Sequence, residues 1–208
     1  REGGFSPSIS DVKLAISLLD KAIKRRNKGR CLIAIDVAAN NFAKTNRMGQ
    51  FIYTMNGRDL TTHELTDYYA SLVDTFPVIA YLEDPFHEND IDGWRRMMHQ
   101  FGQSMLIAAD DLVVSTVSRL KELEGCFNAC ILKVNQAGNI SELLRSHEFC
   151  VKNGIRTIIS QRSGETDSNI ITHMAVGLGS EFFKGGAPAR ERITKYNELI
   201  RIDYRRKH

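Results

Sequence analysis

Long hydrophobic runs are absent from this sequence. No apolar stretch approaches the ~18 residues that a membrane-spanning helix needs, and the opening residues show no signal-peptide pattern. We therefore expect no membrane anchor in these 208 residues.

Cysteine is also scarce, and none of the four cysteines is spaced as C-x-x-C. All of them lie in or beside apolar runs: Cys31, Cys126, Cys130 and Cys150. Disulfides belong to oxidising compartments, and structural zinc needs closely spaced ligands. We therefore expect reduced, buried thiols in a cytoplasmic protein.

Neither sign of charge dominates, because 28 Lys and Arg face 25 Asp and Glu, which gives a net charge of +3. Much of the excess lies in two basic runs, 24–30 and 204–208. Such runs can touch nucleic acid or an acidic partner, but most are solvated helix ends, so no nucleic-acid partner is expected. Apolar residues make up 42% of the chain, which is typical of a soluble domain with a packed core.

What the sequence does contain is a regular alternation. Six short apolar runs recur, and each ends in a charged or amide residue. Runs of this length that are apolar on both faces are typical of buried parallel strands covered by helices. They are LIAID ending at Asp36, VIAYLE at Glu83, MLIAAD at Asp110, CILK at Lys133, TIISQ at Gln161 and EFFK at Lys184.

The gaps between these runs predict helices. Thr61 and Glu64 form a possible capping box, and Gly154 and Gly179 stand where helices end. The first gap is longer, because 50–54 and the turn Asn56-Gly57 indicate a small inserted strand and turn. The predicted helices cover 10–26, 61–73, 91–101, 115–121, 140–153, 168–178 and 188–200.

Strand and helix, repeated six times, indicate an α/β protein with a parallel sheet. Periodicity alone fits a closed barrel and an open doubly wound sheet equally well. The barrel is favoured because no glycine-rich turn follows the first strand and functional residue types end many strands. A closed barrel needs eight strands in ~250 residues. Since the chain starts at Arg1 without an initiator Met, we expect a piece whose first two strands lie upstream.

Acidic residues end three successive strands, at Asp36, Glu83 and Asp110. The carboxyl ends of parallel strands share one face, where three carboxylates repel one another unless a cation lies between them. Oxygen ligands without His or Cys favour Mg²⁺ over zinc. The alternative role for each of the three is a helix N-cap. The neighbouring Asp84-Pro85 and Asp111 make this alternative less favoured.

Basic and polar residues end the other strands. Lys133 closes an otherwise apolar strand, so it must reach the strand ends or pair with a carboxylate. Near a divalent cation its pKa would fall toward that of a base; the alternative is a structural lysine. Lys184 stands before Gly185-Gly186, where backbone can approach a ligand, and Arg162 with Ser163 suits a phosphate or carboxylate, unless Glu165 neutralises Arg162.

These residues lie in stretches that resemble the enolase family, in family order and spacing across essentially the whole chain. The likeness implies a TIM-type βα barrel of the enolase superfamily, with about six of its eight strands present. Residues 1–208 would then be part of the C-terminal barrel domain, without the N-terminal domain. The stretches are REGGFSPSI, IAIDVAANNF, YLEDPFHENDIDGW, IAADDLVVS, ILKVNQAGNISE, ISQRSGETDSN and KGGAPARERITKYNELIRI.

The resemblance implies Mg²⁺-dependent dehydration of 2-phosphoglycerate to phosphoenolpyruvate. Such sites are known to use a Lys or His base with one or two Mg²⁺. It also implies a homodimer of the full-length protein and a small phosphorylated carboxylate as substrate. The roles it implies are metal ligands at Asp36, Glu83 and Asp110, catalytic base at Lys133, general acid at Glu2, phosphate contacts at Gln161, Arg162 and Ser163, and a carboxylate contact at Lys184.

Two positions depart from the family pattern. Gln161 stands where the family usually has His, and an amide can neither carry a positive charge nor shuttle a proton. Arg1 replaces an acidic residue beside Glu2. Three readings therefore stay open: an active enolase, a divergent paralogue with weak or no activity that serves a structural or binding role (with a sperm or flagellar context untested), and another barrel enzyme of the superfamily.

Overall fold

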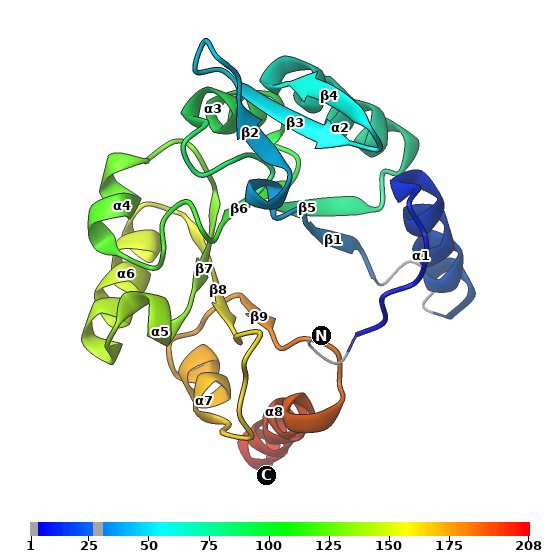
Figure 1. Ribbon diagram of the computed structural model, residues 1–208. Helices are drawn as coiled ribbons and strands as arrows, with labels where there is room; N and C mark the ends of the chain where they lie inside the picture. The colour runs from blue at the N-terminus through cyan, green and yellow to red at the C-terminus, as the bar shows by residue number, and fades with distance from the viewer. Residues whose placement is uncertain (1–3, 27–30) are drawn as a thin grey trace. The chain divides into compact units, whose positions relative to one another are not determined.

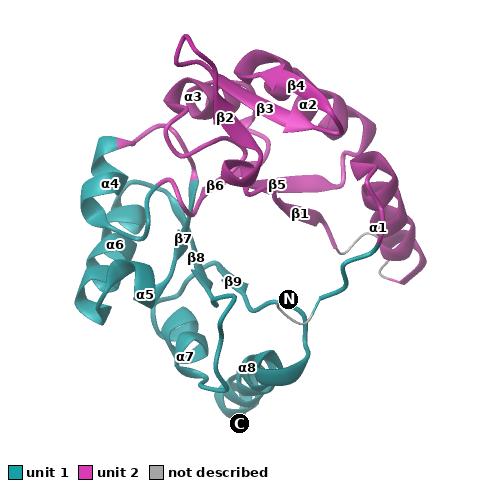
Figure 2. Ribbon diagram, viewed as in Figure 1, with its two compact units in different colours: residues 1–7, 113–122, 129–208 teal, residues 8–112, 123–128 magenta. Residues whose placement is uncertain are grey.

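The computed structural model describes residues 4–26 and 31–208 (Figure 1). It divides into two compact units (Figure 2). Unit 1 contains 1–7, 113–122 and 129–208, and unit 2 contains 8–112 and 123–128. Each unit is built from strands that alternate with helices, as the sequence predicts.

Every one of the six predicted runs forms a strand among the described residues. In unit 2, β5 pairs in parallel with β1 and with β6; in unit 1, β8 pairs in parallel with β7 and with β9. Burial on both faces is complete in β7, all four of whose residues are buried, whereas β1 and β9 keep exposed residues. The strands are β1 (Ile33–Asp36), β5 (Ile79–Glu83), β6 (Leu106–Ala109), β7 (Ala129–Leu132), β8 (Arg156–Ser160) and β9 (Phe182–Lys184).

Helices follow the strands and cover them. In unit 2, α3 packs against β6 and α2; in unit 1, α6 packs against β7 and β8, and α7 against β8 and β9. The capping box at Thr61 and Glu64 is present and starts α2. The helices are α1 (Val12–Arg26), α2 (Thr62–Thr75), α3 (Ile91–Phe101), α4 (Val117–Glu122), α5 (Val134–Ala137), α6 (Ile140–Lys152), α7 (Ile170–Gly177) and α8 (Ile193–Lys207).

The long first gap holds a small antiparallel sheet of β2 (Ala43–Thr45), β3 (Phe51–Met55) and β4 (Arg58–Thr61). The predicted turn is confirmed, since Asn56 and Gly57 both have positive φ, at 51° and 75°. β2 is missed by sequence reasoning because three polar or small residues give no alternating apolar pattern.

The last helix differs most from its predicted bounds of 188–200. It covers Ile193–Lys207 and follows a short 3₁₀ turn, η2 (Arg190–Arg192). Arg190 has a φ of 52°, which an α-helix cannot accommodate, so the helix begins only after it. The one-turn helix α5 directly after Lys133 was not expected, because four residues carry no helical period.

All four cysteines are free thiols. Cys126, Cys130 and Cys150 are buried as predicted, whereas Cys31 is only partly buried. In the described ranges, no helix is both long and apolar enough to span a membrane.

His147 makes the stability of unit 1 depend on pH. It lies on the buried face of α6, 8% exposed, and its Nε2 has no hydrogen-bond partner among the described residues. Burial lowers the pKa of His147 below the 6.5 of a solvated imidazole. The unfolded chain therefore binds this proton more readily, so the contribution of neutral His147 is complete above pH about 6.5 and is lost as pH falls through the lowered folded-state pKa.

We expect the urea midpoint of His147→Gln to fall less between pH 7.5 and 5.5 than that of the wild type, because glutamine does not titrate. Urea unfolding followed by circular dichroism at both pH values checks this. The exposed His63→Gln is the control and should keep the wild-type slope; equal slopes for all three proteins would contradict the assignment.

Candidate active site at the strand ends

The three predicted metal ligands all lie in unit 2, at the carboxyl ends of neighbouring strands. Asp36 is the last residue of β1 and Glu83 the last of β5, and the two are register partners. Asp110 directly follows β6, whose Ala108 pairs with Glu83. Glu83 and Asp110 are only 1% and 7% exposed. The parallel register therefore brings these carboxylates to one edge.

Tyr81 shows that the three charges converge. Its hydroxyl donates to Oε2 of Glu83 at 2.7 Å. The pKa of Tyr81 is raised, first by burial and then by the negative charges of Glu83, Asp36 and Asp110. The negative charges of all three predicted ligands therefore act on one phenol of unit 2.

Asp84 supports this edge and was given no role from the sequence. Its two carboxylate oxygens accept hydrogen bonds from the backbone N–H groups of Asp110 and Asp111, each at 3.0 Å. Its φ of 42° lies in the left-handed region, a strained conformation for a residue with a side chain. Asp84 thus ties the end of β5 to the end of β6. The sequence signal was an acidic residue between a strand-end acid and a proline.

The environment of Asp84 is strongly acidic. Burial is the main cause that raises the pKa of Asp84 to about 8. The hydrogen bonds from the two N–H groups lower this pKa, and the negative charges of Asp110 and Asp111 raise it. Carboxylate oxygens of Asp84, Asp110 and Asp111 lie within 4.8 Å of one another. Such crowding is costly without a cation, and an all-oxygen donor set suits a hard divalent ion. The carboxylates of this group therefore suit a divalent metal, and Asp110 is the one predicted ligand among the described residues that belongs to it.

Lys133 lies in unit 1, directly after β7, as the N-cap residue of α5. Its backbone N–H donates to Oγ of Ser115 at 2.9 Å, and its carbonyl accepts from the N–H groups of Gln136 and Ala137. Ser115 is fully buried and itself has a φ of 55°. The backbone of Lys133 is thus fixed on both sides at the strand end.

Gln161 and Lys184 lie side by side at the ends of β8 and β9. The N–H of Gln161 donates to the carbonyl of Lys184 at 3.0 Å, and the Gln161 side chain is 4% exposed. Gly186 has a φ of 74° and packs against the side chains of Gln161 and Arg192, so a Cβ there would collide with both. Close packing therefore requires glycine at position 186.

Two buried cations hold the segment that follows Gln161. One guanidinium nitrogen of Arg192 donates to the carbonyls of Arg162 and Ser163 at 3.3 and 3.0 Å. Lys195, fully buried, donates to the carbonyl of Thr166 and lies 3.6 Å from a carboxylate oxygen of Glu165. The side chains of Arg162 and Ser163 are exposed. Sequence reasoning missed both cations, because they contact backbone rather than a motif partner.

Glu165 contacts Arg162 through the backbone of that residue. It accepts a hydrogen bond from the backbone N–H of Arg162 at 3.1 Å and also lies near Lys195. The predicted general acid, Glu2, and its neighbour Arg1 fall outside the described residues.

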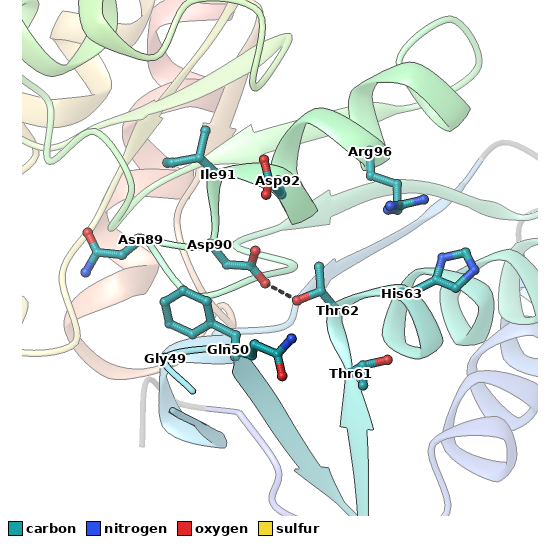
Figure 3. A pocket seen from close by; sticks show the side chains of 11 residues that line it. Gly49, Gln50, Thr61, Thr62, His63, Asn89, Asp90, Ile91, Asp92 and Arg96 are labelled. Atoms are coloured by element: carbon teal, nitrogen blue, oxygen red, sulfur yellow. Dashed lines mark hydrogen bonds between the residues drawn. The ribbon is translucent and has the colours of Figure 1, made fainter. Parts of the chain in front are cut away.

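A pocket of about 520 Å³ lies elsewhere in unit 2 (Figure 3). It is bounded by the β2–β3 turn and the first turns of α2 and α3, and Thr62 donates to Asp90 across it at 2.6 Å. Among the described residues, none of those predicted to bind metal or substrate lines it.

Replacing Asp84 should destabilise the strand-end edge. In Asp84→Asn one of the two N–H donors, at Asp110 or Asp111, would face an amide NH₂ and lose its acceptor. A buried unsatisfied donor costs about 1–3 kcal/mol in the free energy of unfolding. Chemical unfolding measures the change, with the less buried Asp92→Asn on α3 as control, for which about 0.5 kcal/mol or less is expected. No difference between the two variants would remove Asp84 from this role.

Comparison with known proteins identifies the family that the sequence resembles. The family model described as "Enolase, C-terminal TIM barrel domain" matches residues 1–206. An enolase from Methanocaldococcus jannaschii is 40% identical over 207 residues, which cover 97% of this chain and 47% of that protein. The chain thus spans about half the length of this curated relative. With its α/β architecture and acidic strand ends, the chain belongs to the enolase family, in the part that forms the family's C-terminal TIM barrel domain.

Proposed function

We propose that the whole protein carries out the Mg²⁺-dependent dehydration of 2-phosphoglycerate to phosphoenolpyruvate. The observation that carries the proposal is that Asp36, Glu83 and Asp110 end neighbouring parallel strands, in a chain of the enolase family. The relative from M. jannaschii is itself named enolase. Because the chain spans about half of that relative, the activity is proposed for the full-length protein, of which residues 1–208 form part of the barrel domain.

Asp36, Glu83 and Asp110 would hold the Mg²⁺. When bound, the cation supplies positive charge to stabilise the second negative charge that develops on the substrate carboxylate as the C2 proton leaves. Asp84 holds the strand ends of two of these ligands together through its bonds to Asp110 and Asp111. Both oxygens of Asp84 accept hydrogen bonds from backbone N–H groups, so Asp84 would position the ligands rather than bind the cation.

Lys133 would remove the proton from C2 onto Nζ, and Glu2 would give a proton to the C3 hydroxyl as it leaves as water. The fixed backbone of Lys133 supports this, since a base must lie within hydrogen-bond reach of the proton it takes. Exposed Arg162 and Ser163 would bind the phosphate, beside Gln161. Lys184 would contact the substrate carboxylate.

A homodimer and a cytoplasmic location complete the proposal. Both are carried over from the resemblance, and the free thiols agree with a reducing compartment. Subunit mass from light scattering and fractionation of cells tests each directly.

A second candidate is an enolase-like protein with weak or no turnover that serves a structural or binding role. Buried Gln161 favours it, because the amide stands beside Lys184 and cannot transfer a proton. The retained carboxylates and lysines favour the enzyme, since a scaffold gains nothing from buried repelling charges. A spectrophotometric assay of phosphoenolpyruvate formation by the full-length protein separates the two, and a rate within about tenfold of ordinary enolases would exclude the inactive reading.

Lys133→Met should abolish most of the turnover. Loss of a general base typically lowers kcat about 10²–10⁴-fold, and methionine keeps the apolar stem. Lys152→Met, at an exposed position on α6, is the matched control and should retain the wild-type rate. If Lys133→Met keeps its activity, another group is the base.

Gln161→His should raise turnover by about 10²-fold or more, because it restores a group that can carry a proton and a positive charge. Steady-state kinetics of the full-length protein measures kcat and KM. Gln103→His, exposed after α3, controls for an added surface imidazole. An unchanged kcat in Gln161→His would mean that Gln161 does not limit the reaction.

A further inference from the structure

We propose that Tyr81 is a positioning residue that restricts Glu83 to one strong metal-binding oxygen and thereby favours Mg²⁺ over Ca²⁺. The inference deepens the proposed function and rests on it, because it takes Glu83 as a ligand. It concerns how the site discriminates between two divalent cations, which the proposed function does not explain.

The geometry holds Tyr81 in place. Tyr81 and Glu83 are two residues apart on β5, so their side chains share one face of the strand. The hydroxyl donates to Oε2 of Glu83 at 2.7 Å. The backbone of Tyr81 is in register with Ala34 on one side and Leu106 on the other. Because strands flank β5 on both sides, the backbone that carries the phenol is fixed.

The hydrogen bond distinguishes the two oxygens of Glu83. A hydrogen bond to a carboxylate oxygen draws negative charge from it and fixes the rotation of the group. Glu83 is 1% exposed, so the low-dielectric surroundings strengthen the effect. Oε2 is thus the weaker donor toward a cation, and symmetric binding through both oxygens is disfavoured.

The two cations differ in their need for that second oxygen. Ca²⁺ takes 6–8 oxygens at about 2.3–2.6 Å and readily accepts both oxygens of one carboxylate. Mg²⁺ demands an octahedron at about 2.0–2.1 Å and uses single oxygens and water. A glutamate held to one oxygen therefore serves Mg²⁺ well and Ca²⁺ poorly.

A buried phenol could also be satisfied by a carboxylate with no effect on a metal. Unit 2 contains such a case, because the fully buried Tyr53 donates to Asp90 at 2.7 Å, near the start of α3 rather than at the ends of β1, β5 and β6. Tyr53→Phe removes the same kind of hydrogen bond at the same length, together with the one that its hydroxyl accepts from the N–H of His87, so it serves as a control away from the predicted ligands.

The experiment compares wild type, Tyr81→Phe and Tyr53→Phe in the full-length protein, with Kd for Mg²⁺ and Ca²⁺ measured separately by titration calorimetry. In Tyr81→Phe we expect Mg²⁺ binding to weaken about 10–100-fold, as for other groups that orient a ligand. Ca²⁺ binding should weaken less, so that the Kd ratio of Ca²⁺ to Mg²⁺ falls about tenfold. In Tyr53→Phe this ratio should equal that of the wild type.

The outcomes separate the inference from the function. If the wild type binds Mg²⁺ but the ratio is the same in Tyr81→Phe, the inference is overturned while the proposed function stands. If the wild type binds neither cation, both fall. Near-UV circular dichroism verifies folding, and should Tyr81→Phe not fold, Tyr81→Leu serves for the same comparison.

Discussion

The mutual repulsion of carboxylates at neighbouring strand ends, two of them buried, is the constraint on which the site depends. Asp36, Glu83 and Asp110 are brought to one edge by the backbone hydrogen bonds of parallel strands. Those bonds belong to the fold and cannot be released one at a time. The repulsion must therefore be offset locally, and the structure shows two ways: Tyr81 donates to Glu83, and Asp84 turns its oxygens toward backbone donors. A bound divalent cation would supply the remaining compensation.

Unit 1 has the opposite sign of charge at its strand ends. Arg192 and Lys195 are almost fully buried, and backbone carbonyls of the segment after β8 accept their hydrogen bonds. Buried charges of this kind are tolerated only when they are well hydrogen-bonded. They hold the backbone of Arg162 and Ser163, whose own side chains stay exposed. Cationic support behind an exposed arginine and serine suits an anionic substrate.

The sequence predicts most of this architecture, because the strands are short apolar runs that end in functional residues. It predicts the last residues of β1 and β5, Asp36 and Glu83, correctly. The placement of three carboxylates at neighbouring strand ends follows from the same apolar runs. What escapes it are contacts between side chains and backbone: Asp84 to Asp110, and Arg192 to Ser163. Such bonds join residues 26 and 29 positions apart and have no period. They depend on tertiary packing, which no local pattern encodes.

Gln161 fits the packing of the fold but lacks the charge and the proton of a histidine. It is packed against Gly186 and Arg192 and bonded through its backbone to Lys184. An imidazolium here would add a positive charge beside Arg192, which like-charge repulsion disfavours. A neutral amide removes that repulsion while it keeps a polar side chain able to donate and accept hydrogen bonds. A glutamine at this position is therefore compatible with the fold. Under the proposed function, the consequence of glutamine at this position would fall on proton transfer and on phosphate binding, where charge is required.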